Sequence, residues 1–436
     1  MHVVDTIFAL SSGLPPAGIG VIRVSGAAAG DALLALTGRD SLPTQRKAVL
    51  RRIVDPRDGA VLDDALLLWF QGPATATGED LAEIHCHGGR AVIRAVEGAL
   101  AAVSGLRAAE PGEFTRRALI NGRIDLTQAE ALGDLLTAET ETARRIALAN
   151  SGGALRRQID DWGGTIVDLS SRVEAVLDHA DEDDIDEDSI LDVLRQQCRA
   201  LAGAIARALR NPPVERLNEG INVVLAGPPN AGKSTLLNRL VEREAAIVSP
   251  IAGTTRDRVD AAVRRHGVGY VFTDTAGLAE RTDDPVEAIG IERARVAAQT
   301  ADILLWLGDD APPHVDGLTR IIPVHPRSDE AARADAVEGR IRVSAHTGEG
   351  IEDLWALIES ESRDLIPRPD QAAMNQRQRD LCAACVSALD DAAVERDPIL
   401  LAESLRAARA SIDRITGRAD VEAMLDSLFS RFCIGK

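Results

Sequence analysis

The run from Gly227 to Ser234 is the part of the sequence in which residue type and spacing point most directly to chemistry. It fits the pattern G-x-x-x-x-G-K-[ST] and stands between an apolar run, residues 221–226, and a stretch with helical periodicity. Glycines let the backbone wrap a phosphate chain, and the N–H groups at the helix start attract the anion. Lys233 reaches the β and γ oxygens, and Ser234 ligates Mg²⁺. The pattern predicts a nucleoside triphosphate site whose contacts include Asn230, Ala231, Gly232, Lys233, Ser234 and Thr235.

Two further motifs narrow this site to a GTPase. The sequence Asp-Thr-Ala-Gly at 274–277 follows the next apolar strand and places a carboxylate near Mg²⁺ and a glycine N–H near the γ-phosphate. Between the two motifs, Gly-Thr-Thr-Arg-Asp at 253–257 is typical of a switch loop, with Thr255 as the second Mg²⁺ ligand. Together these motifs predict a P-loop GTPase.

The base-reading motif departs from the usual pattern. After the apolar run 321–324, Asn-Lys-x-Asp is expected, but the chain has Pro326, Arg327, Ser328 and Asp329. Asp329 can accept from N1–H and the 2-amino group of guanine, whereas Pro326 has no amide side chain. The later run Ser344, Ala345, His346 can offer the Ala345 N–H to guanine O6. The motif therefore predicts that the site binds GTP in preference to ATP, with a weaker affinity for guanine than the usual Asn-Lys-x-Asp motif would give.

The elements that position these motifs alternate between apolar strand-like runs and helical stretches, which predicts a parallel, doubly wound α/β sheet over residues 218–366. Long Ala/Leu/Arg-rich stretches at 124–217 and 367–436 predict helices on both sides of it, as one helical domain built from two segments. Residues 1–123 mix strand-like and helical runs and predict a separate α+β domain. The fold class is thus multidomain, α+β and α/β. The strand-like runs are 20–24, 65–70, 82–85, 221–226, 270–273, 303–307, 321–324 and 341–343, and the N-terminal helical runs are 27–36 and 91–103.

Composition limits the class of protein further. The chain has 436 residues, with 49 Lys and Arg against 68 Asp and Glu, and its net charge of −19 argues against bulk electrostatic binding of nucleic acid but not against a local basic patch. The excess of acid lies in residues 124–366, and the acidic run Asp178–Asp188 is interpreted as a solvated loop. Five cysteines do not make a disulfide framework, and neither a signal peptide nor a membrane-spanning run is indicated. We expect a soluble, cytoplasmic protein.

Several long motifs outside the nucleotide site occur in a recognisable order. They resemble, essentially from end to end, the signatures of the tRNA modification GTPase MnmE (TrmE) family. The motifs are Asp-Thr-Ile at 5–7, the glycine-rich run 18–26, Gly-Glu-Asp at 78–80, His-Gly-Gly at 87–89, Pro-Gly-Glu-Phe-Thr-Arg-Arg at 111–117, the run 121–130 and Phe-Cys-Ile-Gly-Lys at 432–436.

The resemblance implies an N-terminal folate-binding and dimerising domain at 1–123, a helical domain at 124–217 and 367–436, and a Ras-like G domain inserted at 218–366. It also implies a homodimer that works with the partner MnmG, in a heterotetramer or larger assembly, on the wobble uridine of tRNA and away from membranes. The cofactors implied are GTP, Mg²⁺, K⁺ and 5-formyl- or methylene-tetrahydrofolate, with FAD and NADH on the partner.

Site residues carry over from the family by motif. Folate would be held by Arg23, Glu83, Arg123 and Lys436; the family usually has Lys at position 123, and Arg keeps the charge with a different geometry. A K⁺ ion that supplies positive charge beside the phosphates would be bound by Asn230, Ser249, Ile251 and Thr254. Glu287 would orient the attacking water and Cys433 is a candidate near the modification chemistry, so the catalytic candidates are Glu287, Lys233 and Cys433. The remaining predicted nucleotide contacts are Ser249, Thr254, Thr255, Asp274, Thr275, Ala276, Gly277, Asp329, Ser344, Ala345 and His346.

Two other functions compete with this one. The chain could be a GTPase switch in ribosome assembly or translation, although no RNA-binding domain follows the G domain. It could also be a folate-binding scaffold with impaired hydrolysis, which Pro326 motivates.

Two short motifs are interpreted as structural rather than chemical. His85-Cys86-His87 has the residue types of a metal site, and Cys382-x-x-Cys385 has the spacing of a redox pair but lies inside a helical run.

Overall fold

The computed structural model divides the chain into two compact units, residues 1–133 with 413–436 and residues 134–412, and each unit is described by itself. Two helices, α4 and α13, cross the boundary between the units. The described residues are 5–178, 187–228, 230–242, 260–274, 301–312, 320–333, 335, 337–368, 373–419, 425, 428–429, 432 and 435.

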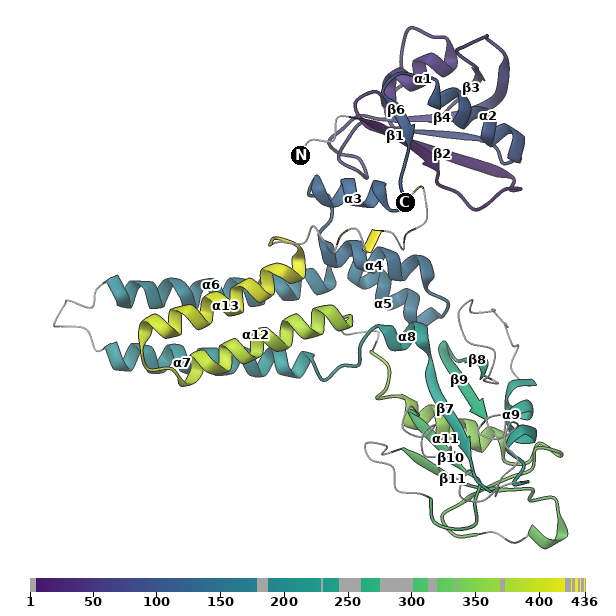
Figure 1. The fold of residues 1–436 in the computed structure, drawn as a ribbon, viewed down its shortest axis with the longest axis vertical. Helices are drawn as coiled ribbons and strands as arrows, with labels where there is room; N and C mark the ends of the chain where they lie inside the picture. The colour runs from purple at the N-terminus through teal and green to yellow at the C-terminus, as the bar shows by residue number, and fades with distance from the viewer. Residues whose placement is uncertain are drawn as a thin grey trace, which may run out of the picture. The chain divides into compact units, whose positions relative to one another are not determined.

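The first unit is built on a six-stranded sheet with the order β3-β4-β5-β2-β1-β6 (Figure 1). Neighbouring strands are antiparallel except for the parallel pair β1 and β6. The apolar runs predicted at 20–24, 65–70 and 82–85 are confirmed as β2, β4 and β5. The strands are β1 (Thr6–Leu10), β2 (Ile19–Ser25), β3 (Val49–Val54), β4 (Val61–Phe70), β5 (Leu81–His87) and β6 (Leu106–Ala108).

Alternation along the strands divides the side chains of this sheet between its two faces. On one face, Phe8, Ile22 and Ile84 form a core with the helices α1 (Ala29–Thr37) and α2 (Arg90–Ala101). On the other face, Ile7 and Ala9 pack against Phe114 of α3 (Glu113–Ile120). Because Ala9 is the cross-strand partner of Arg23, the second face also carries Arg23.

The last described residues of the chain return to this unit. Phe429 and Phe432 pack with Leu126 at the start of α4 (Leu126–Thr137). Gly435 has φ of +97°, and a Cβ at this position would collide with the carbonyl oxygen of Leu10 at the end of β1. Glycine is therefore required where the tail meets the sheet. The hydroxyl of Ser11 donates to the Gly435 carbonyl at 2.7 Å.

The second unit contains long helices, which confirms the helical periodicity of the sequence. Apolar residues of α6 recur every three or four positions, as Ile159, Trp162, Ile166 and Leu169 do, and they are buried. Helices α7 and α12 pack side by side along much of their length (Figure 1). The helices are α5 (Glu141–Ser151), α6 (Ala154–Asp178), α7 (Glu187–Ala208), α8 (Glu215–Glu219), α12 (Gln376–Val394) and α13 (Pro398–Thr416).

Cys382 and Cys385 lie buried in α12. Burial raises the pKa of each thiol to about 12, so neither forms the thiolate that redox chemistry needs at neutral pH.

The second unit also contains a six-stranded sheet with the order β12-β11-β10-β7-β9-β8. Its strands are parallel except at the edge, where β8 is antiparallel to β9. The core against α11 (Ile351–Ser362) centres on Trp355, Tyr270 and Phe272. The five predicted strand runs are all present, and β8 is a strand that the prediction lacked. The strands are β7 (Ile221–Ala226), β8 (Asp260–Arg265), β9 (Val268–Asp274), β10 (Ile303–Trp306), β11 (Ile321–Pro326) and β12 (Ile341–Val343).

Within the part of the chain that the structure describes, no helix combines the length and the apolar character needed to span a bilayer.

Candidate functional site

The glycine-rich loop joins the central strand β7 to the helix α9 (Lys233–Glu242). Three described residues of this loop have positive φ angles: Gly227 with φ of +155°, Asn230 with φ of +63° and Gly232 with φ of +90°. Glycine and asparagine tolerate this conformation better than other residues. The loop can therefore curl back over the helix start, where N–H groups without helical partners attract phosphate.

Lys233 is held inside this loop. Its ammonium donates to the carbonyls of Gly227 at 3.0 Å and Pro228 at 2.9 Å. Burial lowers its pKa, and the nearby carboxylate of Asp274 acts in the opposite direction. An ammonium held by neutral carbonyls in a partly dry loop gains much from an anionic ligand, because attraction between opposite charges strengthens as water is excluded.

Ser234 and Asp274 meet although 40 residues separate them in sequence. The strands β7 and β9 are parallel neighbours, with Leu225 opposite Asp274, so the end of β9 lies beside the start of α9. The Ser234 hydroxyl donates to Asp274 Oδ2 at 2.5 Å. A hydroxyl and a carboxylate are hard oxygen ligands of the kind that Mg²⁺ prefers, so this pair fits the ion that the motifs imply.

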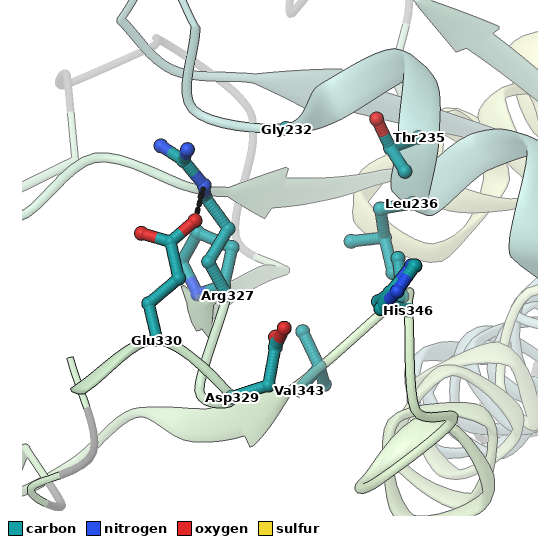
Figure 2. A pocket seen from close by; sticks show the side chains of 10 residues that line it. Gly232, Thr235, Leu236, Arg327, Asp329, Glu330, Val343 and His346 are labelled. Atoms are coloured by element: carbon teal, nitrogen blue, oxygen red, sulfur yellow. Dashed lines mark ion pairs between the residues drawn. The ribbon is translucent and has the colours of Figure 1, made fainter.

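A cavity of about 230 Å³ lies between the helix α9 and the loops after β11 and β12. Figure 2 shows the paired side chains of Arg327 and Glu330 on one side of it, His346 on the other and Asp329 between them. Its lining residues are Gly232, Thr235, Leu236, Pro326, Arg327, Asp329, Glu330, Val343, Ala345 and His346. The structure thus brings three of the predicted base-reading residues, Asp329, Ala345 and His346, to one cavity.

Asp329 is prepared to accept hydrogen bonds in this cavity. A hydrogen bond from Ser344 lowers the pKa of its carboxyl group, with smaller contributions from its own backbone N–H and from His346. The carboxylate therefore stays ionised and can accept from an N–H edge such as that of guanine. Ser344 is buried beneath the cavity and acts on Asp329 rather than lining the cavity.

Arg327 makes a contact that the sequence did not predict. Its backbone is left-handed, with φ of +63°, and its Nη1 donates to the carbonyl oxygen of Asn230 at 3.3 Å. Its Nε pairs with Glu330 at 2.7 Å. Arg327 therefore joins the base-reading loop to the phosphate loop, next to Pro326, which offers no donor.

A second candidate site lies on the face of the first sheet that also packs against α3. Arg23 on β2 and Glu83 on β5 are cross-strand partners, and Nε and Nη2 of Arg23 donate to Oε1 of Glu83 at 3.3 and 3.0 Å. Oε2 of the same carboxylate lies 3.3 Å from Nε2 of His85. The guanidinium of Arg23 also lies 5.9 Å from the ring centroid of Phe114. The structure therefore pairs two of the predicted folate residues and adds His85.

Arg123 lies on a loop of the same unit. It is exposed, and its Nε donates to the carbonyl of Thr75 at 3.0 Å, rather than joining the Arg23–Glu83 pair. Asn121, two residues earlier, donates to the carbonyl of Thr77 at 2.7 Å. Lys436 falls outside the described residues, but Gly435 next to it lies against Leu10.

Comparison with known proteins decides the family. A model described as the MnmE helical domain matches residues 126–433, and one described as the GTP-binding protein TrmE N-terminus matches residues 6–123. The tRNA modification GTPase MnmE of Novosphingobium aromaticivorans is 51% identical over 440 residues, covering 99% of this chain and 100% of that protein. The same protein of Rhizorhabdus wittichii is 53% identical over 433 residues, covering 99% of this chain and 97% of that protein. This chain belongs to the MnmE family of tRNA modification GTPases.

Because the chain belongs to the MnmE family, it is a GTP hydrolase that acts in tRNA modification, and the family implies GTP and Mg²⁺ as its ligands. Some predicted site residues of this MnmE chain lie outside the described residues, so their placement stays a prediction. They are Ser249, Ile251, Thr254, Thr255, Thr275, Ala276, Gly277, Glu287, Cys433 and Lys436.

Sequence reasoning missed two contacts in this MnmE chain, one at each site. The alternation of Glu83 and His85 on β5 was a signal that both side chains share a face, but it did not show that they touch. The Arg327–Asn230 contact had no local signal, because 97 residues separate its partners.

Proposed function

We propose that this chain hydrolyses GTP in a K⁺-stimulated cycle, in the cytoplasm, as a homodimer whose G domains meet across the bound nucleotides. With the partner MnmG, the cycle drives addition of a carboxymethylaminomethyl or aminomethyl group at C5 of the wobble uridine, position 34, of tRNA. A tetrahydrofolate supplies the one-carbon unit. The observation that carries the proposal is the full-length match to MnmE proteins.

The nucleotide half of the proposal is supported by the phosphate loop. Lys233 and the N–H groups at the start of α9 would bind the phosphates, and Ser234 with Asp274 would hold Mg²⁺. The ion would offset the negative charge that builds up on the transferred phosphoryl group. Asp329 would select guanine, because its ionised carboxylate accepts from a donor edge that adenine lacks.

The proposed K⁺ site gives a direct prediction. Asn230 lies in the phosphate loop with a left-handed backbone, and Ser249, Ile251 and Thr254 complete the proposed ligand set. Asn230→Gly removes the side-chain oxygen and keeps a residue that accepts φ of +63°. We expect the GTPase rate of the native protein to be faster in K⁺ than in Na⁺, and that of Asn230→Gly to be equally slow in both. Equal rates for the native protein would remove K⁺ from the mechanism.

The folate half rests on the chemistry of the sheet face. Arg23 and Arg123 are cations that suit the glutamate carboxylates of a tetrahydrofolate, and Lys436 would add a third. Glu83 is an acceptor for the amino-amide edge of the pterin. Arg23 and Glu83 are 27% and 19% exposed, so a ligand can reach them without unfolding the sheet.

The decisive experiment is mass spectrometry of tRNA nucleosides from cells with and without the gene. We expect the modified wobble uridine to disappear on deletion and to return with the native gene. A gene encoding Lys233→Ala should fail to restore it, whereas Arg333→Gln, which alters an exposed ion pair in the same G domain, should succeed. An unchanged nucleoside profile would defeat the proposal and leave the ribosome-assembly switch as the alternative.

Pro326 favours one competing function, a folate-binding scaffold with impaired turnover, because the base-reading loop lacks a side-chain donor there. Steady-state hydrolysis in K⁺ separates the two. Turnover stimulated by K⁺ supports the enzyme, and folate binding without turnover supports the scaffold.

A further inference from the structure

The histidines of the His85-Cys86-His87 run are given separate partners by the fold. His85 Nε2 lies 3.3 Å from Glu83 Oε2, whereas His87 Nδ1 lies 2.8 Å from Asp63 Oδ1. Cys86 is buried on the opposite face of β5. Across the residues that the structure describes, no cluster of three metal-ligating side chains forms. The role of this run must therefore be sought in the carboxylates that its histidines contact.

Glu83 is held from two directions, by Arg23 and by His85. Arg23 reaches Oε1 from the neighbouring strand at 3.3 and 3.0 Å, and His85 reaches Oε2 from two residues further along the same strand. An ionised carboxylate is an acceptor alone, so Nε2 of His85 carries the proton in this contact. Because the two donors bind different oxygens of Glu83, they fix the rotation of the carboxylate about the Cγ–Cδ bond.

His85 has apolar neighbours across both adjacent strands. Its cross-strand partners are Val21 on β2 and Leu66 on β4, and neither side chain can accept a hydrogen bond. These neighbours leave Glu83 as the acceptor for Nε2. The packing thus directs the imidazole at the carboxylate.

The held carboxylate keeps capacity for a ligand. Its two oxygens offer about four acceptor positions, of which the two Arg23 contacts and the His85 contact use three. Glu83 and His85 are 19% and 26% exposed, so part of each side chain is open to solvent. A ligand N–H can bind there without displacing either protein donor.

We propose that His85 is a positioning residue for the folate site: it orients the Glu83 carboxylate toward the N–H edge of a pterin-type heterocycle. The proposal rests on the folate half of the proposed function. It assigns no proton transfer to His85, and its effect is on ligand affinity.

The test measures binding of 5-formyltetrahydrofolate to the full-length protein by isothermal titration calorimetry. His85→Ala removes the donor, and because hydrogen bonds to charged groups are stronger than neutral ones, we expect the dissociation constant to rise about threefold to tenfold. His85→Gln keeps an N–H donor on a side chain of similar reach, and we expect affinity within about twofold of the native protein. His87→Ala is the matched control, because His87 lies on the same strand face but pairs with Asp63, and its affinity should not change.

A double variant separates positioning from a direct contact between His85 and the ligand. If His85 acts through Glu83, the variant His85→Ala with Glu83→Gln should bind no more weakly than Glu83→Gln alone. Additive losses would overturn the proposal. So would a native-like affinity of His85→Ala, or equal losses in His85→Ala and His85→Gln.

The failure of the folate site itself is recognisable. If the native protein does not bind the folate, or if Glu83→Gln binds as well as the native protein, the folate half of the proposed function is wrong and the inference falls with it. If Glu83→Gln loses affinity and His85→Ala does not, the site stands and the inference alone is wrong. Melting temperatures of the variants should match that of the native protein, since His85 is partly exposed; a large fall for His85→Ala would assign the residue to stability instead.

Discussion

The two sheets of this chain carry their candidate sites in different places. In the G domain, Lys233, Asp274 and Asp329 lie at or beyond the ends of the parallel strands β7, β9 and β11. In the first unit, Arg23 and Glu83 project from the middle of antiparallel strands onto the face of the sheet that also packs against α3. The loops that follow parallel strands meet at one edge of the sheet, and this does not depend on the side chains of the strands. A site on the face of a sheet forms only if the strands pair in one particular register, because the register decides which side chains are neighbours.

The supports beneath the two sites also differ. Lys233 is a buried cation that the loop carbonyls hold, with the Asp274 carboxylate nearby. The first unit instead contains an ionic network around Arg117, which is 2% exposed and pairs with Asp5, Glu79 and Glu113. Glu79 also accepts from Ser25 on β2, so the network reaches the strand that carries Arg23. The comparison teaches that the phosphate loop is built from one local segment, whereas the face site depends on strand pairing over long sequence distances.

Among the variants that test this difference, Lys233→Ala should have the largest effect. Loss of a preorganised cation at the phosphates should lower kcat/KM for GTP about 100-fold or more. Folate affinity should not change, because the folate residues belong to the other unit. The measurements are phosphate release and folate calorimetry on the same preparation, with Arg333→Gln as the control. A parallel loss of folate affinity would break the distinction between the sites.

Arg117→Met should have the next largest effect, on stability rather than on nucleotide chemistry. Removing one partner of a buried ion pair leaves uncompensated charge and costs about 3–5 kcal/mol. Hydrogen exchange of the β1 amides and urea unfolding would measure the loss in the first unit. Arg52→Met is the control, because Arg52 and Asp64 are an exposed pair whose loss should cost about 1 kcal/mol or less.

The pH dependence of stability checks the same network. Burial alone would raise the pKa of Glu113, but hydrogen bonds from Arg107, the Glu110 backbone and Arg117 outweigh it and lower the pKa below 4.5. The unfolded state then binds more protons than the folded state, so the stabilisation is present above pH 4.5 and is lost as pH falls through the lower folded pKa. Arg117→Met should show a smaller loss in this window. An unchanged acid profile would exclude Arg117 from the network's energetics.

The smallest expected effect comes from Pro326→Asn in the base-reading loop. An amide side chain adds a donor at the rim of the cavity, and one hydrogen bond corresponds to roughly a twofold to tenfold gain in GDP affinity. Calorimetry with GDP and ADP would measure it, with the native protein as reference. A gain in affinity for GDP but not for ADP would show that one side chain at position 326 can improve guanine binding in the G-domain cavity. Equal affinities of the variant and the native protein would show that Arg327 already provides what position 326 lacks.

The sequence predicted most strands that are long and apolar, and it missed four others. Length does not explain why β1 and β6 were missed, because β12 is as short as β6 and was predicted. The strands β3 and β8 carry paired arginines that mask their alternation. Such strands are stabilised by their neighbours in the sheet and not by their own pattern. The antiparallel edge strand β8 was missed for this reason, although the parallel pairing of the other five strands was predicted from the repeating strand and helix pattern.

The sequence by itself determined the phosphate loop and the family, because each depends on contiguous residues whose backbone chemistry is local. The tertiary structure alone decided that His85 contacts Glu83, that Arg327 contacts Asn230 and that Gly435 lies against the end of β1. An alternating pattern states which side chains share a face, but burial of the core selects the partner strand and the register. For the same physical reason, the phosphate loop could be predicted as a unit, and the second site only as a list of residues; the nucleotide contacts outside the described residues stay predictions.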